Sequence, residues 1–356
     1  MLLQTCTIPI TLNRSAEEYR VLFQTPHFTK SIRFMSIRGR VLPDDIPVSS
    51  GHEQAVFAEV AGRIPTLHHL RCIEMSRLEP SILLLDAIFR SAFNKPMKLT
   101  LSLNTYPVEY KFPGQDLKIY HIEAYVANSY CDSSDKATIA RAFLPRLVSA
   151  CAATLSSLHI YDDHFHTKMW DLPPVRLKSL TTSAAQDQSL VAFLRSQVSL
   201  EELKVRMDDP GADEWASSLS GSDLPNLRSV TAAYRSIRYL VPGRPIREVN
   251  PDVCRGVNFD WYYPARDFLR STCRSAAGDG VESLDLGAVL PESMSMLVLS
   301  ESLGSLSNIR SLGIPCGLKV RQSHALPEHF LSPWKGNFTS FYLLREPTEA
   351  DLSLSP

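Results

Sequence analysis

The sequence lacks the motifs that identify most enzyme and membrane-protein classes. It contains no G-x-x-x-x-G-K-S/T, G-x-S-x-G or H-E-x-x-H motif, so phosphate-binding loops, nucleophile elbows and metalloprotease zinc sites have no support. No apolar run approaches the roughly 18 residues that span a bilayer. The apolar N-terminal stretch is broken by Gln4, Thr5 and Pro9 and has no basic region. We therefore expect neither a membrane span nor a secretory signal.

The sequence also has no excess of charge of one sign and no cluster of cysteines. The chain has 37 basic and 38 acidic residues and a net charge of −1, so nothing directs it to nucleic acid or to an anionic membrane. Its seven cysteines are odd in number, widely spaced and without a C-x-x-C pair, which argues against a disulfide framework or a zinc module. We expect reduced thiols in an intracellular protein, cytoplasmic or nuclear, without a cofactor.

What the chain does have is a recurring apolar phrase: Leu, two residues, Leu, one residue and a further apolar residue. The copies lie at 155–160, 200–205, 281–286 and 309–314, with degenerate copies at 67–72, 177–182 and 227–232. Each copy alternates apolar and polar residues, which predicts a short strand with one wet face. Amphipathic patterns between the copies predict helices at 52–64, after Pro80, and at 135–153, 187–197, 264–277 and 291–303.

The spacing of the phrases predicts the architecture. From Leu158 to Leu312 the second anchors are separated by 22, 23, 27, 54 and 28 residues, and a degenerate strand at 242–249 divides the longest gap. Leucine-rich repeats have periods of about 20–29 residues. Earlier strands are expected at 31–37, 67–73, 96–103 and 117–126. We expect an α/β leucine-rich-repeat solenoid, with about ten strands in one curved parallel sheet, helices on its convex side and irregular repeats.

A doubly wound α/β domain also alternates strand and helix. Its central strands are near-continuous apolar runs, whereas these strands alternate apolar residues with Ser, His, Lys and Asp, which favours the solenoid. We expect a helical lead-in or cap at 1–30 and a solenoid at 31–345 with an insertion near 250–263. A flexible tail is expected at 346–356.

Two parts of the chain resemble fungal F-box/leucine-rich-repeat proteins. Residues 14–27, followed by the strand at 31–37, resemble the segment that comes after the F-box in that family. Residues 224–230 and 240–249 resemble a phrase of its repeats. The resemblance implies the substrate-recognition repeat region of an F-box ubiquitin-ligase adaptor.

The F-box itself is not found. In that family it is a helical module, commonly near the N-terminus, with a Leu-Pro pair near its start. Leu42-Pro43 has these opening letters, but residues 47–51 cannot continue a helix and a strand already precedes them. A cullin-type ubiquitin-ligase partner is therefore expected only if an F-box exists upstream.

The variable residues between the apolar anchors form the candidate binding surface. Strand alternation places them on one face. They are Arg71, His159, Thr181, Lys204, Thr231, Asp285 and Gly313, with Tyr161, Glu202 and Arg206 at flanking positions. This mixed, moderately polar surface resembles non-obligate protein interfaces. We expect a protein partner on the concave sheet face, with a merely solvated face as the alternative.

Two further clusters have competing interpretations. Trp261 and Tyr262 in the insertion are a candidate partner hot spot, or they fold back to cover the insertion. His164 and His166, with Asp162 or Asp163, have donors that suit a divalent metal. No further distant ligand stands out, so we interpret that cluster as a solvated loop and expect no metal site.

Together these observations predict a non-enzymatic protein–protein interaction scaffold, because the sheet faces of solenoids suit extended partners. Two alternatives stay open. One is an α/β enzyme with its site at the strand C-termini. The other is a truncated repeat protein that has no F-box and no ligase role.

Overall fold

The structure is a computed structural model that describes residues 6–11, 13–39, 50–102, 110–114, 116–126, 143–162, 170, 172, 175–183, 188–206, 214–251, 268, 270–278, 280–286, 308–315 and 340–344. Within them thirteen strands follow one another in chain order, and every strand pair that the structure gives is parallel. The prediction of an α/β fold with an unclosed parallel sheet is confirmed. The expected number of about ten strands is too low.

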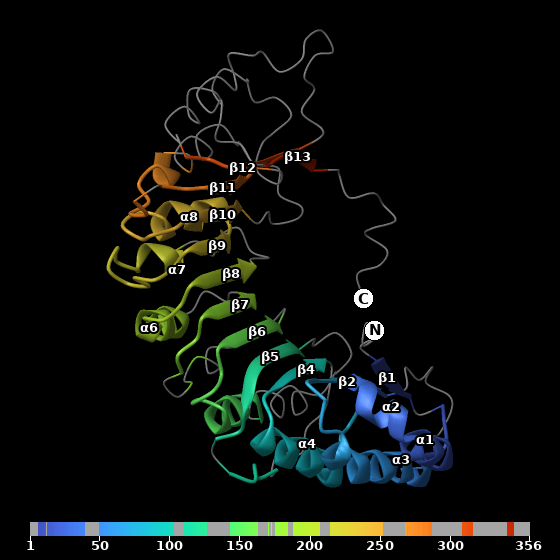
Figure 1. Cartoon of the computed structure of the whole chain (residues 1–356). Coiled ribbons are helices and arrows are strands. Elements are labelled where there is room, and N and C mark those ends of the chain that lie inside the picture. The colour runs from blue at the N-terminus through green and yellow to red at the C-terminus, as the bar shows by residue number, and fades with distance from the viewer. Residues whose placement is uncertain are drawn as a thin grey trace. The chain divides into compact units, whose positions relative to one another are not determined.

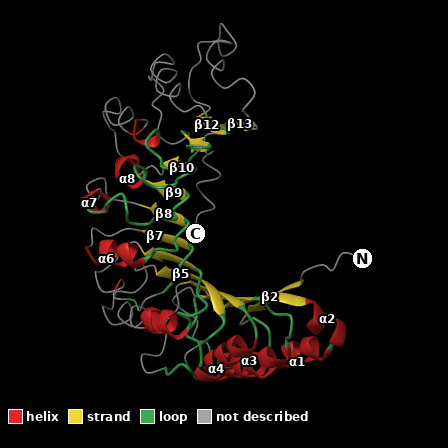
Figure 2. Ribbon diagram, turned by 60° about the vertical axis from the view of Figure 1, so that its left-hand side comes forward, coloured by secondary structure: helices red, strands yellow, loops and turns green. Residues whose placement is uncertain are grey.

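The chain divides into two units, Met1–Ser179 and Leu180–Pro356. The strands of the first unit are β1 (Cys6–Thr11), β2 (Ile32–Arg38), β3 (Cys72–Ser76), β4 (Met97–Ser102), β5 (Ile119–Val126) and β6 (Ser157–Asp162). Its helices are α1 (Ala16–Gln24), α2 (Pro26–Ser31), α3 (Ser50–Arg63) and α4 (Ile82–Asn94), with a 3₁₀ turn, η1, at Ile64–Thr66. Helices α1, α3 and α4 lie on one side of these strands (Figures 1 and 2).

One apolar residue per strand forms the central row of the first unit's core. The strand register aligns Ile8, Met35, Ile73, Leu99, Ile122 and Leu158 as neighbours. Each of these side chains is at most 2% exposed. Burying one such side chain contributes about 1.5–3 kcal/mol, so the repeat phrase is first of all a core-forming pattern.

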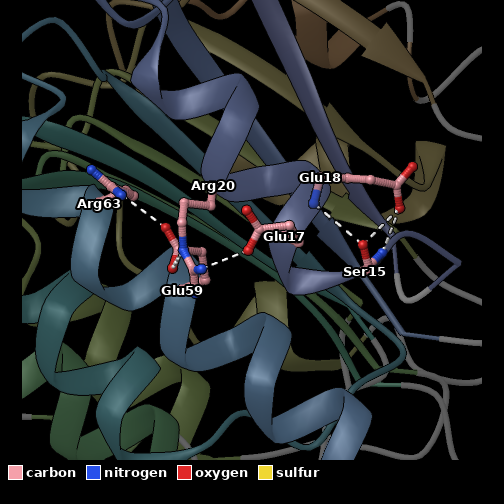
Figure 3. A network of polar contacts seen from close by, with 6 residues as sticks. All are labelled: Ser15, Glu17, Glu18, Arg20, Glu59 and Arg63. Atoms are coloured by element: carbon pink, nitrogen blue, oxygen red, sulfur yellow. Dashed lines mark hydrogen bonds and ion pairs between the residues drawn. The ribbon is translucent and has the colours of Figure 1, made fainter.

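Helix α1 is fixed at its start and along its side. Ser15 caps the helix, because its hydroxyl accepts a hydrogen bond from the Glu18 N–H at 3.2 Å and its own N–H donates to the Glu18 carboxylate at 2.7 Å. This backbone hydrogen bond, first among several causes, lowers the pKa of Glu18. Arg20 reaches from α1 to Glu59 of α3 at 3.4 Å, and Arg63 binds the same carboxylate at 2.9 Å (Figure 3).

The second unit repeats the same plan. Its strands are β7 (Ser179–Ser183, which begins at the unit boundary), β8 (Glu202–Arg206), β9 (Ser229–Ala232), β10 (Glu248–Pro251), β11 (Ser283–Asp285), β12 (Ser311–Pro315) and β13 (Ser340–Leu344). Its helices are α6 (Gln188–Ser196), α7 (Glu214–Ser217) and α8 (Tyr234–Leu240). The register again aligns fully buried anchors, namely Leu203, Val230, Val249, Leu284 and Leu312.

Strand β10 explains the long gap in the repeat spacing. Val249 is its anchor, and β10 pairs with β9 on one side and β11 on the other. The prediction of a degenerate strand at 242–249 is right about its existence but places it too early. The matching phrase is Ile246-x-x-Val249-x-Pro251, in which Ile and Val replace leucine.

A buried arginine holds the turn between α8 and β10 together. The Arg244 side chain is fully buried. Its guanidinium donates hydrogen bonds to the backbone carbonyls of Asp223, Tyr239 and Leu240, each at 2.8 Å, and to that of Ser220. The Tyr239 and Leu240 carbonyls belong to the last turn of α8. Carbonyls in the last turn of a helix have no N–H partner within the helix, and Arg244 supplies the missing donors. Burial lowers the pKa of Arg244, and the Asp223 charge opposes that shift.

The backbone before Arg244 requires glycine. Gly243 has φ +77°, a left-handed conformation that residues with a Cβ rarely adopt. A Cβ here would also lie 3.3 Å from Cα of Gly221. The Pro242-Gly243-Arg244 phrase therefore has a local physical role, which is to turn the chain and cap α8.

Some expectations differ from the structure or lie outside its described residues. The region 1–30 contains the predicted helix, α1, but it begins with strand β1, which pairs in parallel with β2. Proline at position 9 is compatible with this strand because β1 is the edge strand. Parts of two further expected helices are confirmed: residues 143–150 are helical within 135–153, and residues 268 and 270–272 are helical within 264–277. The expected helix at 291–303 and the tail at 346–356 fall outside the described residues.

Candidate protein-binding face

The sheet face of the first unit opposite α1, α3 and α4 carries the candidate site, and we call it the open face (Figure 2). Its side chains alternate with the buried anchors. Across β4, β5 and β6 they form three rows, Lys98–His121–Ser157, Thr100–Glu123–His159 and Ser102–Tyr125–Tyr161. Each row holds side chains about 4.8 Å apart from strand to strand, so neighbouring groups can interact directly.

Glu123 is the centre of a polar network on this face. Its carboxylate forms an ion pair with Lys98 Nζ at 3.0 Å and accepts a hydrogen bond from the Tyr125 hydroxyl at 2.7 Å. Thr100 Oγ1 donates to it more weakly, at 3.4 Å. His121 Nε2 lies 3.8 Å away, beyond hydrogen-bond distance, and this buried atom has no other partner among the described residues. His121, Tyr125 and Lys98 together hold the pKa of Glu123 well below its usual range.

Two ring pairs join β5 to β6 beside this network. Tyr125 and Tyr161 are direct register partners, and their rings stack with centroids 4.6 Å apart and planes 14° from parallel. His121 and His159 meet edge to face at 4.6 Å, and His159 Nε2 also lies 3.2 Å from Ser157 Oγ. The Tyr125 side chain is 39% exposed. The face therefore presents an ordered aromatic pair next to a fixed ion pair.

This arrangement suits recognition better than chemistry. Glu123 is ionised and already paired at neutral pH, whereas a general base works best with a pKa near the operating pH. Cys72 lies on the same face, but burial raises the pKa of its thiol to about 11, which keeps it protonated and unreactive. Cys72, Cys151 and Cys273 carry free thiols, in agreement with the expectation for these three cysteines.

No cluster of metal-ligating side chains is present among the residues that the structure describes. The nearest approach to one is His121, Glu123 and His159, but the Lys98 ammonium already binds the Glu123 carboxylate. His164, His166 and Asp163 lie outside the described residues, as does the side chain of Asp162.

The structure places two of the expected binding residues, His159 and Tyr161, on the open face, in strand β6. Arg71 lies elsewhere, because it precedes β3 and its backbone N–H donates to the Arg33 carbonyl. The strand register shows the reason. Ile73 pairs with Leu99 and Met35, so the phrase is Leu70-x-x-Ile73-x-Met75 and its variable residue is Glu74. The frame predicted at 67–72 begins three residues too early, at Leu67 instead of Leu70.

The remaining candidates are distributed over the strands of the second unit. Thr181 lies on β7, Glu202, Lys204 and Arg206 on β8, Thr231 on β9, Asp285 on β11 and Gly313 on β12. The register pairs Lys204 with Thr231 and Asp285 with Gly313, as the ladder requires. Thr181 is only 4% exposed and offers little side-chain surface to a partner. Trp261 and Tyr262 lie outside the described residues, as do most of the segments that follow the strands, where the enzyme alternative has its site.

The predicted ladder does not contain the open-face residues Lys98, Thr100, His121, Glu123 and Tyr125. The sequence predicts strands at 96–103 and 117–126, but their anchors do not match the leucine phrase. The signal is Ile119-x-x-Ile122-x-Ala124, which has isoleucine and alanine where the clear copies have leucine. Counting any buried aliphatic residue as an anchor would identify Glu123 as the variable residue of β5.

Comparison with known protein families finds no family model that matches the chain, and comparison with curated proteins finds no matching sequence. Among the helices within the described ranges, none is both long and apolar enough to cross a membrane.

Proposed function

We propose that this chain is a non-enzymatic leucine-rich-repeat protein that binds another protein through its open face. The observation that carries this proposal is the stacked Tyr125–Tyr161 pair, fixed beside the Lys98–Glu123 ion pair on the face opposite α1, α3 and α4 (Figure 2). An intracellular location, cytoplasmic or nuclear, is part of the proposal.

The repeat pattern supports the leucine-rich-repeat assignment. In both units the same position of the phrase becomes a buried anchor, and the next residue falls on the opposite face of the strand. Each such repeat buries its apolar side against its neighbours, which leaves the variable residues to recognise a partner.

The energetics of the open face favour binding. Tyrosine is enriched among residues that dominate interface energies, because it buries a large rigid surface. Tyr125 is already held by Glu123 and Tyr161, so little side-chain entropy is lost when a partner packs on it. The ion pair beside it supplies orientation and specificity more than affinity.

A site-specific photo-crosslinker tests this proposal. Placed at Ser102, the register partner of Tyr125 on β4, it should give discrete protein adducts in cell extract. The same adducts should disappear when Tyr125 and Tyr161 are both replaced by alanine. A crosslinker at Arg90 on α4, whose side chain is 72% exposed, is the control and should not give these adducts. Adducts that survive the double alanine change, or that appear equally from Arg90, would overturn the proposal.

The ligase role is a separate part of the proposal, because it depends on the resemblance to F-box adaptors. The full-length natural protein, purified from cells, should bring down cullin-type ubiquitin-ligase subunits. A preparation that yields the open-face partner without any such subunit would reject the adaptor role and favour a repeat protein with no ligase role.

A further inference from the structure

A group of basic side chains lies at the starts of β3 and β4 and next to the start of β2 in the first unit. We call Arg33, His68, His69, Arg71 and Lys95 the basic edge. The Arg71 N–H donates to the Arg33 carbonyl at 2.8 Å, the Arg33 guanidinium lies 3.4 Å from the His69 carbonyl, and Lys95 Nζ donates to the Leu67 carbonyl. His68, His69 and Arg71 are exposed, and the other two are half-buried.

These side chains are not neutralised by acidic neighbours. In the described part of the chain, no ion pair involves any of the five. The second unit differs at the equivalent strand starts. There Glu282 lies between Arg247 at 3.2 Å and Arg310 at 3.5 Å, and it binds both. The equivalent strand starts therefore include a carboxylate in the second unit, whereas the basic edge of the first unit contains none.

The pKa values of His69 and Lys95 reflect the positive charge of the basic edge. Arg33, before all other causes, lowers the pKa of His69, and His68, Arg71 and Lys95 act in the same direction. Burial, followed by the charge of Arg71, lowers the pKa of Lys95 to about 8. Every charge that shifts the pKa of His69 is positive, so a bound anion would interact favourably with the basic edge.

We propose that the basic edge binds an acidic segment of the partner protein. This inference rests on the proposed function and names the chemistry of the partner. Arg33 and Arg71 are planar, permanently charged donors that suit carboxylate groups, and neighbouring strands place their backbones about 4.8 Å apart. A protein segment fits better than nucleic acid because the chain has a net charge of −1 and the basic edge has no Phe, Tyr or Trp on which bases could stack.

The test uses a short fluorescein-labelled peptide of alternating glutamate and serine, with a glutamine–serine peptide as the neutral probe. The full chain should bind the acidic peptide in low salt, lose it as salt rises, and ignore the neutral peptide. The R33Q/R71Q variant should bind at least about tenfold more weakly. The matched control R247Q/R310Q removes two arginines that share the Glu282 carboxylate, and it should change binding by less than about twofold.

Three results of the binding assay would overturn the inference: equal loss in both double variants, equal binding of the neutral peptide, or equally tight binding of an oligonucleotide of the same charge. Thermal melts of both variants show whether they remain folded. Failure of this inference is distinguishable from failure of the proposed function. If R33Q/R71Q leaves the Ser102 crosslinked adducts intact, the open-face proposal stands and the acidic-segment inference fails. If the Ser102 adducts survive the replacement of Tyr125 and Tyr161 by alanine, the proposed function itself fails.

Discussion

Replacing Arg244 by methionine should destabilise the second unit by about 3–5 kcal/mol. Methionine keeps most of the apolar volume but removes the donors to the carbonyls of Ser220, Asp223, Tyr239 and Leu240. Each hydrogen bond to a charged group contributes about 1.5–3 kcal/mol, but the cost of burying the cation offsets part of the sum. The remainder is a large fraction of the roughly 5–15 kcal/mol that stabilises a typical domain.

Urea unfolding, followed by hydrogen exchange, measures this effect. The midpoint should fall, and the amides of α8 and β10 should lose protection before those of the first unit, because repeat units are stabilised mainly by their neighbours. Arg238→Met is the matched control, since Arg238 lies on the same helix but is exposed, and it should change stability by less than about 1 kcal/mol. A variant at Arg244 that unfolds within about 1 kcal/mol of the parent chain would refute the capping role.

Three further perturbations test the core, the cap and the open face. Leu158→Ala removes a fully buried anchor and should cost about 2–5 kcal/mol in urea unfolding. Ser15→Ala removes the acceptor for the Glu18 N–H and should cost about 1 kcal/mol by the same measurement. Glu123→Gln should cost about 1 kcal/mol at neutral pH. Because the folded-state pKa of Glu123 is lowered, its stabilising effect is complete above the ordinary glutamate pKa of 4.5 and is lost as pH falls from there through the lowered folded-state pKa. The difference between parent and Glu123→Gln should therefore shrink in acid, and a constant difference would contradict the ion-pair network.

The repeat phrase predicts the fold where its anchors are leucine and loses accuracy where they are not. Leu158 and Leu203 are anchors of β6 and β8, as the phrase predicts. The phrases of β3 and β5 have Ile73 and Ile122 at the same position, so the leucine pattern places the β3 phrase three residues too early and misses the β5 phrase. A one-residue slip moves every side chain to the opposite face, so small errors in frame change which residues are predicted to bind.

The burial of Arg244 could not be predicted from local sequence. Arginine in a Pro-Gly turn is usually exposed. Here the acceptors come from the end of α8 and from residues 220 and 223, and only the folded chain brings these carbonyls together. The Glu123 network could not be predicted from local sequence either, because its ion pair and its tyrosine stack each join two neighbouring strands.

The most direct test of the account is the affinity of the Tyr125→Ala/Tyr161→Ala variant for the protein crosslinked from Ser102. The account predicts at least about tenfold weaker binding. Loss of the stack and of the hydrogen bond to Glu123 should also lower the free energy of unfolding by about 1–3 kcal/mol, so thermal melts must show that the variant is folded at the assay temperature. A Leu83→Ala variant on α4, where the side chain is 64% exposed, should bind as the parent does. Unchanged affinity in the double tyrosine variant, with the partner's binding lost instead in Leu83→Ala, would contradict the assignment of the open face as the binding surface.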